Sequence, residues 1–308
     1  MLPDFSGSTP LLTCTPLCRS VADITGNQEA DPAVAGWTFA GEPISPGPSS
    51  EIMTLVEGSA FCISRATGDI ERGPAHGLFF RDTRLLSHWQ LLIDGEPPEL
   101  LTQLTEEPLA ATFVGRSGPR DGLADSTVLV MRKRYVGHGM REDIVVRNLG
   151  SSPLRCKLQM SVGSDFADLF EVKEHRVRIH GDHTIVIDGD GLRLERRWRG
   201  KSRGTKVEAV GWTANKSGVL AIDITVAPRA EWHGTLQVQP VADGVVGPVD
   251  YPSDKPVDHA EPAQRLQQWR RDSPLIHTDH AGLGKLIART QEDLGALRIF
   301  DPEHPGRV

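Results

Sequence analysis

The segment LRCKLQMSV, residues 154–162, alternates apolar and polar side chains along its length. In an extended chain, successive side chains point to opposite faces. Leu154, Cys156, Leu158 and Met160 therefore share one face, and the polar residues between them share the other. This pattern predicts a β-strand with one buried face and one face in water.

Similar short segments recur on both sides of this strand, and Gly- or Asp-containing turns separate them. IMTLVEGSAFCIS (52–64) predicts two strands around Glu57–Gly58, and Asp94–Gly95 between apolar runs predicts a hairpin. Further predicted strands lie at 126–136, 140–148, 177–180, 184–188, 192–198, 206–214, 218–226 and 233–240. This rhythm predicts a mainly β protein, an antiparallel β-sandwich that is supersandwich-like, and not a chain of βαβ units.

Composition divides the chain into three parts. Residues 1–50 are rich in Ser, Thr, Pro and Gly and predict a flexible, low-complexity tail, with a short strand at Trp37–Phe39. Residues 51–250 carry the sandwich. Residues 251–308 predict a linker with one or two C-terminal helices.

The first predicted helix spans Glu261–Asp272, and Asp279 is the predicted cap of the second. Five apolar residues of the second helix fall on one helical face, which needs a surface to cover it. They are Leu283, Leu286, Ile287, Leu294 and Leu297.

Charge and cysteine content exclude several classes of function. The net charge of −7 argues against a nucleic-acid partner. No apolar run approaches the length of a membrane span, and the N-terminus has no signal-peptide pattern. Four scattered cysteines predict reduced thiols, hence a cytoplasmic protein. Cys14 and Cys18 lack the second ligand pair of a structural zinc site, so we expect neither a metal nor a cofactor.

The first candidate site is SDFADLFEVKE (164–174), where Asp165, Asp168 and Glu171 recur every third residue. One helical turn brings such residues to one side. Paired carboxylates can serve glycoside hydrolysis, which is one hypothesis. The others are a sugar or interdomain contact and a structural turn whose carboxylates cap backbone amides.

The second candidate is Arg81-Asp82-Thr83-Arg84, which lies between Phe79–Phe80 and Leu85–Leu86. Alternating charges in an apolar setting predict a partly buried ion pair, which needs further hydrogen bonds. The alternative is that Arg81, Asp82 and Arg84 bind hydroxyl groups at a domain edge.

Trp198 lies in the one basic run, 193–206, and is the third candidate. Three interpretations are open for Trp198: a solvated hairpin tip, a stacking platform for nucleic acid and a surface for a sugar ring. Trp212 is an equal candidate for sugar stacking. His180 and His183 have no evident third metal ligand, and for Glu142 a pairing with Arg141 or another strand is favoured over an acid role.

Four segments in this order resemble the N-terminal domain of glycogen debranching enzymes of the amylo-α-1,6-glucosidase type. They are LVEGSAFCIS with GDI, then GLFFRDTRLLSHWQLLIDG, GMREDIVVRN and DFADLFEVKE. The resemblance covers about residues 55–300, and HTDHAGLGKLIARTQEDLGALRI (277–299) is similar to the first helix of the family's (α/α)6 barrel.

The resemblance implies a domain that packs on a catalytic barrel and helps to shape its substrate cleft. The family's catalytic carboxylates lie in that barrel, so no catalytic residue is assigned here. The chain is expected to be a truncated, inactive part of such an enzyme. Seven residues become candidates for a glucan-facing or interdomain surface: Arg81, Asp82, Arg84, Asp165, Asp168, Glu171 and Trp198.

The implied partners are an α-glucan or oligosaccharide, and the catalytic barrel in cis or in trans, or a second copy of the chain. Two other readings are open. One is a stand-alone carbohydrate-binding module, and the other is a small glycoside hydrolase that uses Asp165, Asp168 or Glu171.

Overall fold

The computed structural model describes residues 52–73, 75–120 and 125–300, and 49% of these described residues are strand against 15% helix. All strand pairs within these residues are antiparallel. The mainly β, antiparallel prediction is therefore confirmed. The predicted tail at 1–50, the strand at Trp37–Phe39, Cys14, Cys18 and residues 301–308 lie outside the described residues.

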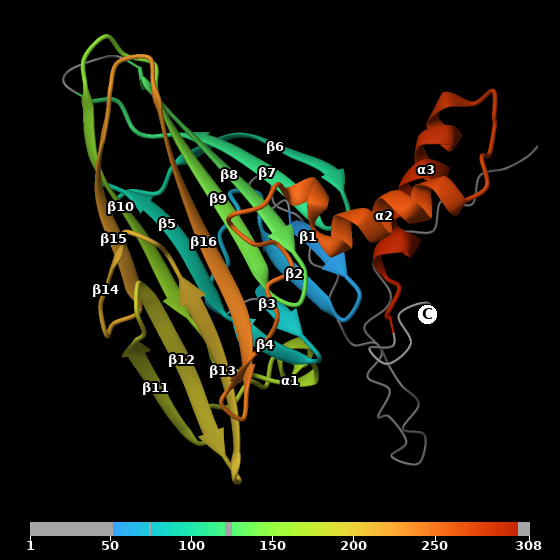
Figure 1. Cartoon of the computed structure of the whole chain (residues 1–308), viewed down its shortest axis with the longest axis horizontal. Coiled ribbons are helices and arrows are strands. Elements are labelled where there is room, and N and C mark those ends of the chain that lie inside the picture. Colours follow the sequence, from blue (N-terminus) through green and yellow to red (C-terminus); the bar gives the residue numbers. More distant parts are fainter. Residues whose placement is uncertain (1–51, 74, 121–124, 301–308) are drawn as a thin grey trace, which may run out of the picture. The chain divides into compact units, whose positions relative to one another are not determined.

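The strands form three sheets (Figure 1). The first has the order β1 (Ile52–Glu57), β2 (Ala60–Arg65), β3 (Gly77–Phe80), β4 (Thr83–Leu86). The second has the order β14 (Thr213–Ala214), β15 (Val219–Val226), β10 (Leu154–Gly163), β5 (His88–Ile93). The third has the order β11 (Asp182–Ile187), β12 (Gly191–Trp198), β13 (Lys201–Glu208), β16 (Glu231–Ala242), β9 (Met140–Asn148), β8 (Val128–Val136), β7 (Ala110–Arg116), β6 (Glu99–Glu107), and β17 (Val245–Val246) pairs with β16.

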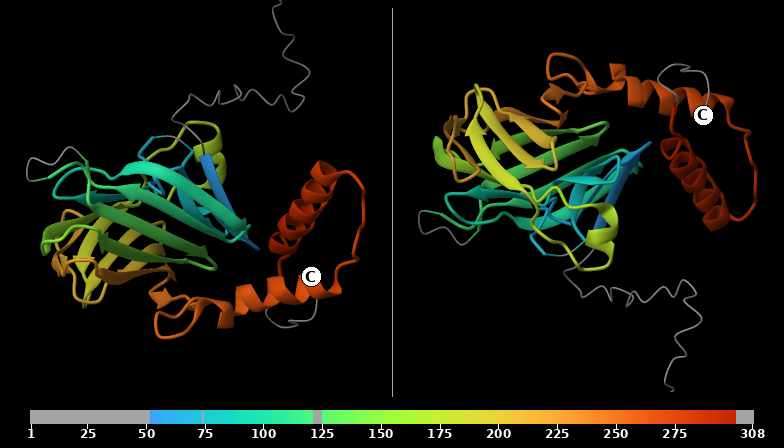
Figure 2. Two further views of the ribbon diagram at one scale, coloured as in Figure 1. Left: turned by 90° about the horizontal axis from the view of Figure 1, so that it is seen from above. Right: turned by 90° about the horizontal axis from the view of Figure 1, so that it is seen from below.

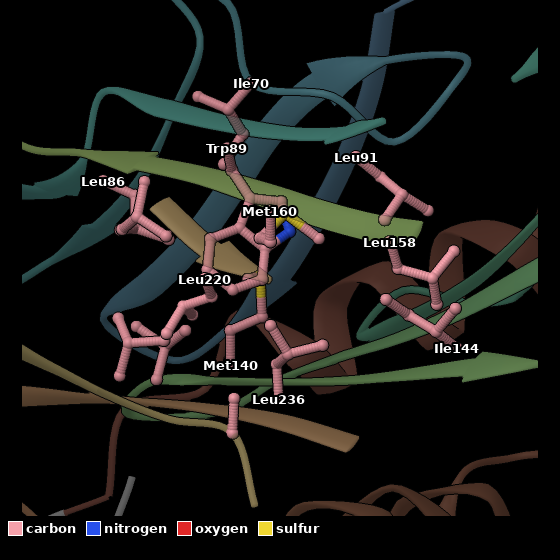
Figure 3. Packing of buried hydrophobic residues seen from close by; sticks show 14 of the residues in the cluster. Ile70, Leu86, Trp89, Leu91, Met140, Ile144, Leu158, Met160, Leu220 and Leu236 are labelled. Atoms are coloured by element: carbon pink, nitrogen blue, oxygen red, sulfur yellow. The ribbon is translucent and has the colours of Figure 1, made fainter. Parts of the chain in front are cut away.

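One large apolar core lies between the sheets (Figure 3). The apolar face of β10 contributes Leu158 and Met160, which are fully buried, as the alternation of that segment predicted. They pack with Trp89 of β5 and, from the third sheet, with Met140 and Leu236. Full burial of a side chain of this size contributes about 1.5–3 kcal/mol.

Three strand predictions differ from the structure. The predicted strand 206–214 is divided, because β13 ends at Glu208, a turn follows, and Thr213–Ala214 form β14 in another sheet. Asp94 and Gly95 do form a tight turn with positive φ, but the flanking strands β5 and β6 belong to different sheets. The turn closes a single antiparallel pair, Ile93 with Glu96, and the chain then leaves for another sheet, so the hairpin does not extend beyond that pair. The predicted strand at 177–180 is irregular in the structure. The strand β11 begins only at Asp182 and pairs there with β12.

Two C-terminal helices follow the strands and lie beside each other (Figure 2). Helix α2 spans Glu261–Asp272, as predicted. Helix α3 spans Ala281–Ala296, but its N-cap is His280 and not Asp279, because Nδ1 of His280 accepts the backbone N–H of Leu283 at 3.1 Å. A short 3₁₀ helix, η1 (Val257–His259), precedes them.

A charged network lies inside the sandwich. Glu142 of β9 is 0% exposed and accepts from Arg132 at 2.7 Å and from Arg134 at 2.5 Å, both on β8. Arg132 also pairs with Asp69 at 2.5 Å, and Arg134 donates to the carbonyl of Gly68. Burial alone would raise the pKa of Glu142, but the two arginine charges outweigh it and lower that pKa. Glu142 thus pairs with a neighbouring strand, as the sequence favoured.

Within the described residues, no helix is both long enough and apolar enough to cross a bilayer. The same part of the chain has no group of three His, Cys, Asp or Glu side chains placed to hold a metal ion. Cys62 and Cys156 are buried free thiols, and Cys62 packs in the core.

Candidate functional site

The acidic segment forms a short capped helix, α1 (Leu169–Lys173). Asp168 is its N-cap, with its side chain accepting the N–H of Phe170 at 2.9 Å, and Glu171 reaches back to the N–H of Asp168 at 3.2 Å. This reciprocal arrangement is a capping box, which satisfies amides at both positions. The hypothesis of carboxylates that cap a structural turn is therefore confirmed for Asp168 and Glu171.

Backbone hydrogen bonds attach α1 to the β3–β4 turn (Figure 1). The N–H of Leu169 donates to the carbonyl of Asp82 at 2.8 Å, and the N–H of Arg84 donates to Ala167 at 2.9 Å. Thr83 and Asp168 form an isolated antiparallel bridge between these bonds. Two segments 80 residues apart in the sequence thus form one structural unit.

An ion pair locks this unit from inside. Nε and Nη2 of Arg84 donate to the two carboxylate oxygens of Asp165 at 3.0 and 2.5 Å, a bidentate fork. The side chains of Arg84 and Asp165 are 4% and 19% exposed. Gly77 makes room for the fork, since a Cβ there would lie 2.6 Å from Cδ of Arg84. The predicted ion pair exists, but Arg84 pairs with Asp165 and not with Asp82.

The backbone between Asp165 and α1 is strained. Phe166 is buried and has a φ of 51°, which is unusual for a bulky residue. Its carbonyl accepts a hydrogen bond from Arg196 of β12 at 2.6 Å. Such a conformation persists only where its surroundings enforce it, and it is typical of functional segments.

Five side chains of this unit are exposed, those of Arg81, Asp82, Asp168, Phe170 and Lys173. Arg81 and Asp82 occupy the tip of the β3–β4 turn, and Phe170 on α1 is 53% exposed. The guanidinium of Arg81 lies 5.1 Å from the ring centroid of Phe80. A rigid turn that presents an aromatic ring beside a carboxylate and a guanidinium can contact either a sugar or another protein surface.

Trp198 joins the same region from the tip of β12. The imidazole of His180 stacks on its ring at a centroid distance of 4.8 Å, and Nε2 of His180 lies 3.6 Å from Glu171. The guanidinium of Arg199 lies 4.4 Å from the Trp198 centroid. A sugar ring would therefore compete with these side chains for Trp198. Trp212 is buried against Trp232 and offers no exposed face.

The structure thus brings all seven predicted residues to one end of the sandwich. We call this region the α1 end, defined as residues 81–84, residues 165–173, His180 and Trp198. Arg84, Asp165, Asp168 and Glu171 mainly hold it together. Arg81 and Asp82 are available for contacts, together with Phe170, which sequence reasoning treated only as a structural anchor.

A second feature was missed. A cleft of about 350 Å³ lies between the strand turns and the C-terminal helices, and we call it the junction cleft. Its lining residues are Glu57, Gly58, Ser59, Ala60, Phe80, Arg81, His138, Glu261, Arg265, Arg298, Ile299 and Phe300. These residues come from five separate segments, and no regular spacing in the sequence marks them as a site.

Two titratable groups on the cleft wall have shifted pKa values. Burial raises the pKa of Glu57, although Arg265 pairs with it at 2.5 Å. The hydrogen bond that Nδ1–H of His138 donates to the carboxylate of Asp250, at 2.8 Å, raises the pKa of His138. Gly58 closes the wall with a φ of 54°, and its N–H donates to the carbonyl of Ala296 on α3 at 2.6 Å.

A family model described as the N-terminal domain of (some) glycogen debranching enzymes matches residues 55–237, and the chain belongs to this family. The match includes both the β3–β4 turn and α1. No curated protein matches the chain.

Several solved structures align with the chain at low similarity. A putative kojibiose phosphorylase from the human microbiome aligns with a TM-score of 0.40 and 10% identity, over 79% of this chain and 35% of that protein. A galactose mutarotase-like protein from Clostridium acetobutylicum aligns with a TM-score of 0.32 and 6% identity, over 63% and 99%. A 4-alpha-glucanotransferase from Thermococcus litoralis aligns with a TM-score of 0.30 and 11% identity, over 61% and 39%. The chain thus spans about a third of the phosphorylase.

Proposed function

We propose that the chain is a non-catalytic N-terminal β-sandwich domain of a glycogen debranching, amylo-α-1,6-glucosidase-like protein. In this role it supports α-glucan binding or a catalytic (α/α)6 barrel in cytoplasmic polysaccharide metabolism. The observation that carries the proposal is the α1 end. Contacts among three distant segments hold it rigid, and it presents Arg81, Asp82 and Phe170 outward.

A contact role is favoured over chemistry at the α1 end because its carboxylates have structural partners. Asp165 is forked with Arg84, and Asp168 and Glu171 form the capping box. A general acid and a nucleophile need free carboxyl groups at a defined separation across a sugar. Release of sugar from branched glucan by the purified chain, and its loss in Asp168→Asn, would instead support the small-hydrolase alternative.

Glucan contact is tested by affinity electrophoresis of the 308-residue chain in gels containing glycogen. We expect glycogen to retard the chain, and Asp82→Asn and Phe170→Ala each to weaken binding several-fold. Asn suits the positive φ of Asp82, and Phe170 is exposed, so neither change should alter the fold. Unretarded migration of the wild-type chain would overturn the glucan part of the proposal.

The stand-alone carbohydrate-binding module is kept as the second candidate on one observation. Trp198 lines a shallow depression of about 600 Å³ together with Asp182, Glu195 and Arg197. An aromatic ring beside polar side chains suits a pyranose. In the same gels, a loss of binding in Trp198→Ala with Asp82→Asn unchanged would favour this alternative.

The partner part of the proposal concerns α3. The apolar face predicted from the sequence is largely exposed, with Leu286 at 63% and Leu294 at 54%. An apolar face of this kind on a helix is typical of an interaction surface. We assign it to the catalytic barrel, in cis or in trans, or to a second copy of the chain.

The double substitution Leu286→Ser, Leu294→Ser tests this surface. We expect less self-association in light scattering after gel filtration, with the urea midpoint of unfolding unchanged, because both side chains are exposed. Leu266→Ser on α2 is the control, since Leu266 is buried and its loss should lower the midpoint. A comparable fall in the midpoint for the α3 variant would show that the face is buried within this chain.

A further inference from the structure

The junction cleft has an excess of positive charge on a chain whose net charge is −7. Three guanidinium groups line it, from Arg81, Arg265 and Arg298, against two carboxylates, from Glu57 and Glu261. Both carboxylates pair with Arg265, at 2.5 and 2.8 Å. Within the described part of the chain, Arg81 and Arg298 therefore have no carboxylate partner.

Arg298 is held in place by contacts that leave its charge uncompensated. Its Nε donates to the carbonyl of Gly295 at 3.1 Å and its Nη2 to the carbonyl of Arg265 at 3.3 Å, and its guanidinium lies 4.5 Å from the ring centroid of Trp269 and 5.0 Å from that of Phe300. Arg265 lies 4.8 Å from the same Phe300 ring. Burial, together with the charge of Arg265, lowers the pKa of Arg298. Two like charges near one ring favour the binding of an anion.

Arg81 approaches the cleft from the opposite wall. Its backbone N–H donates to the carbonyl of Ser59 at 3.1 Å, and its guanidinium lies over Phe80. Among residues 52–73, 75–120 and 125–300, its guanidinium makes neither an ion pair nor a hydrogen bond. The N–H groups of the Arg81 guanidinium are thus available to a ligand without the loss of another hydrogen bond.

We propose that the junction cleft binds a small phosphate-bearing molecule, up to the size of a hexose phosphate, through Arg81 and Arg298. The planar guanidinium fork matches a phosphate group better than it matches a neutral hydroxyl. Glu57 and Glu261 hold Arg265 in place between them, and the aromatic rings of Phe80 and Phe300 complete the walls. A volume of about 350 Å³ is within the range of small-ligand sites.

This inference is independent of the proposed function, because an α-glucan is neutral and its proposed contacts lie at the α1 end. Arg81 belongs to both regions, whereas Arg298 lies only in the cleft and Asp82 is not among the cleft's lining residues. Arg298 substitutions therefore report on the cleft, and Asp82 substitutions report on glucan contact.

The test is isothermal titration calorimetry of the 308-residue chain with glucose 1-phosphate, inorganic phosphate and maltotriose. We expect glucose 1-phosphate to bind at one site, inorganic phosphate to bind at the same site, and maltotriose not to bind there. Affinity should fall as salt is added, because the attraction is electrostatic. Equal affinity for the two phosphates would identify free phosphate as the ligand of the cleft.

Arg298→Gln and Arg81→Gln should each weaken glucose 1-phosphate binding at least about tenfold, as expected for the loss of a charge-assisted hydrogen bond. Arg155→Gln is the control, since Arg155 is an exposed arginine of β10 outside the cleft. Melting temperatures of all three variants verify that they fold, and ligand should raise that of the wild-type chain. The proposal is overturned if glucose 1-phosphate at about 10 mM does not bind, because its dissociation constant would then be too high for a specific site. It is also overturned by an equal loss in Arg155→Gln, or by maltotriose binding that depends on Arg298.

Discussion

Glu142→Gln should destabilise the chain by about 3–5 kcal/mol, the usual cost of removing one partner of a buried ion pair. Glu142 accepts hydrogen bonds from both Arg132 and Arg134 and is fully buried. Glutamine has nearly the same shape but no charge, and its amide N–H groups face arginine donors. Arg132 would keep its pair with Asp69, and the buried charge of Arg134 would lose its pair with Glu142.

The measurement is urea unfolding followed by tryptophan fluorescence, with the midpoint compared between variants. Glu99→Gln is the matched control, because Glu99 is a strand glutamate whose side chain is 65% exposed and whose partner is Arg116. Exposed ion pairs contribute little to stability, so the urea midpoint of Glu99→Gln should stay at the wild-type value. Equal midpoints for the two variants would contradict the assigned role of Glu142.

A second variant distinguishes the loss of one charge of the ion pair from the loss of both. Arg134→Met combined with Glu142→Leu removes both charges and leaves Arg132 paired with Asp69. Replacing a buried ion pair by apolar groups of similar volume is often close to neutral. The double variant should therefore be more stable than Glu142→Gln alone. A double variant that is less stable would mean that the network contributes more than the compensation of charge.

Local patterns identified most strands and the first C-terminal helix. Alternation of apolar and polar residues located β10, and apolar residues three positions apart located α2. Such patterns report which side of a segment is buried, but they do not report which strand lies beside it. The Asp94–Gly95 turn shows the difference, because its backbone is as predicted and yet β5 pairs with β10.

Partners of charged residues were hard to predict for the same reason. Arg141 is adjacent to Glu142 in the sequence, but the strand register places Arg134 directly opposite Glu142. Arg84 finds its partner 81 residues away. The sequence singled out the segments of the α1 end because their charged residues are dense and local. It missed the junction cleft because Glu57, His138 and Arg298 converge only after folding.

Asp165→Asn is the second large effect that we expect, and it connects the stability of the α1 end with its exposed surface. Arg84 is almost fully buried and would lose the bidentate carboxylate of Asp165, while one amide N–H of the new side chain would face Nη2 of Arg84. Hydrogen bonds to charged groups contribute about 1.5–3 kcal/mol each, so a loss of about 2–3 kcal/mol is expected. Asp165 also accepts the N–H of Ala167, beside the strained Phe166.

The loss of stability should appear first in the α1 end and only then in the whole domain. Hydrogen exchange measured by mass spectrometry should speed up in residues 164–174, because the fork fixes the segment that holds Phe166 at positive φ. Asp168→Asn is the control, since asparagine caps a helix about as well as aspartate and the fork is untouched. If both variants exchanged alike, the capping box and not the ion pair would hold α1. If Asp165→Asn alone loosened the segment and also lost glycogen retardation, a rigid presentation of Asp82 and Phe170 would be what glucan contact requires.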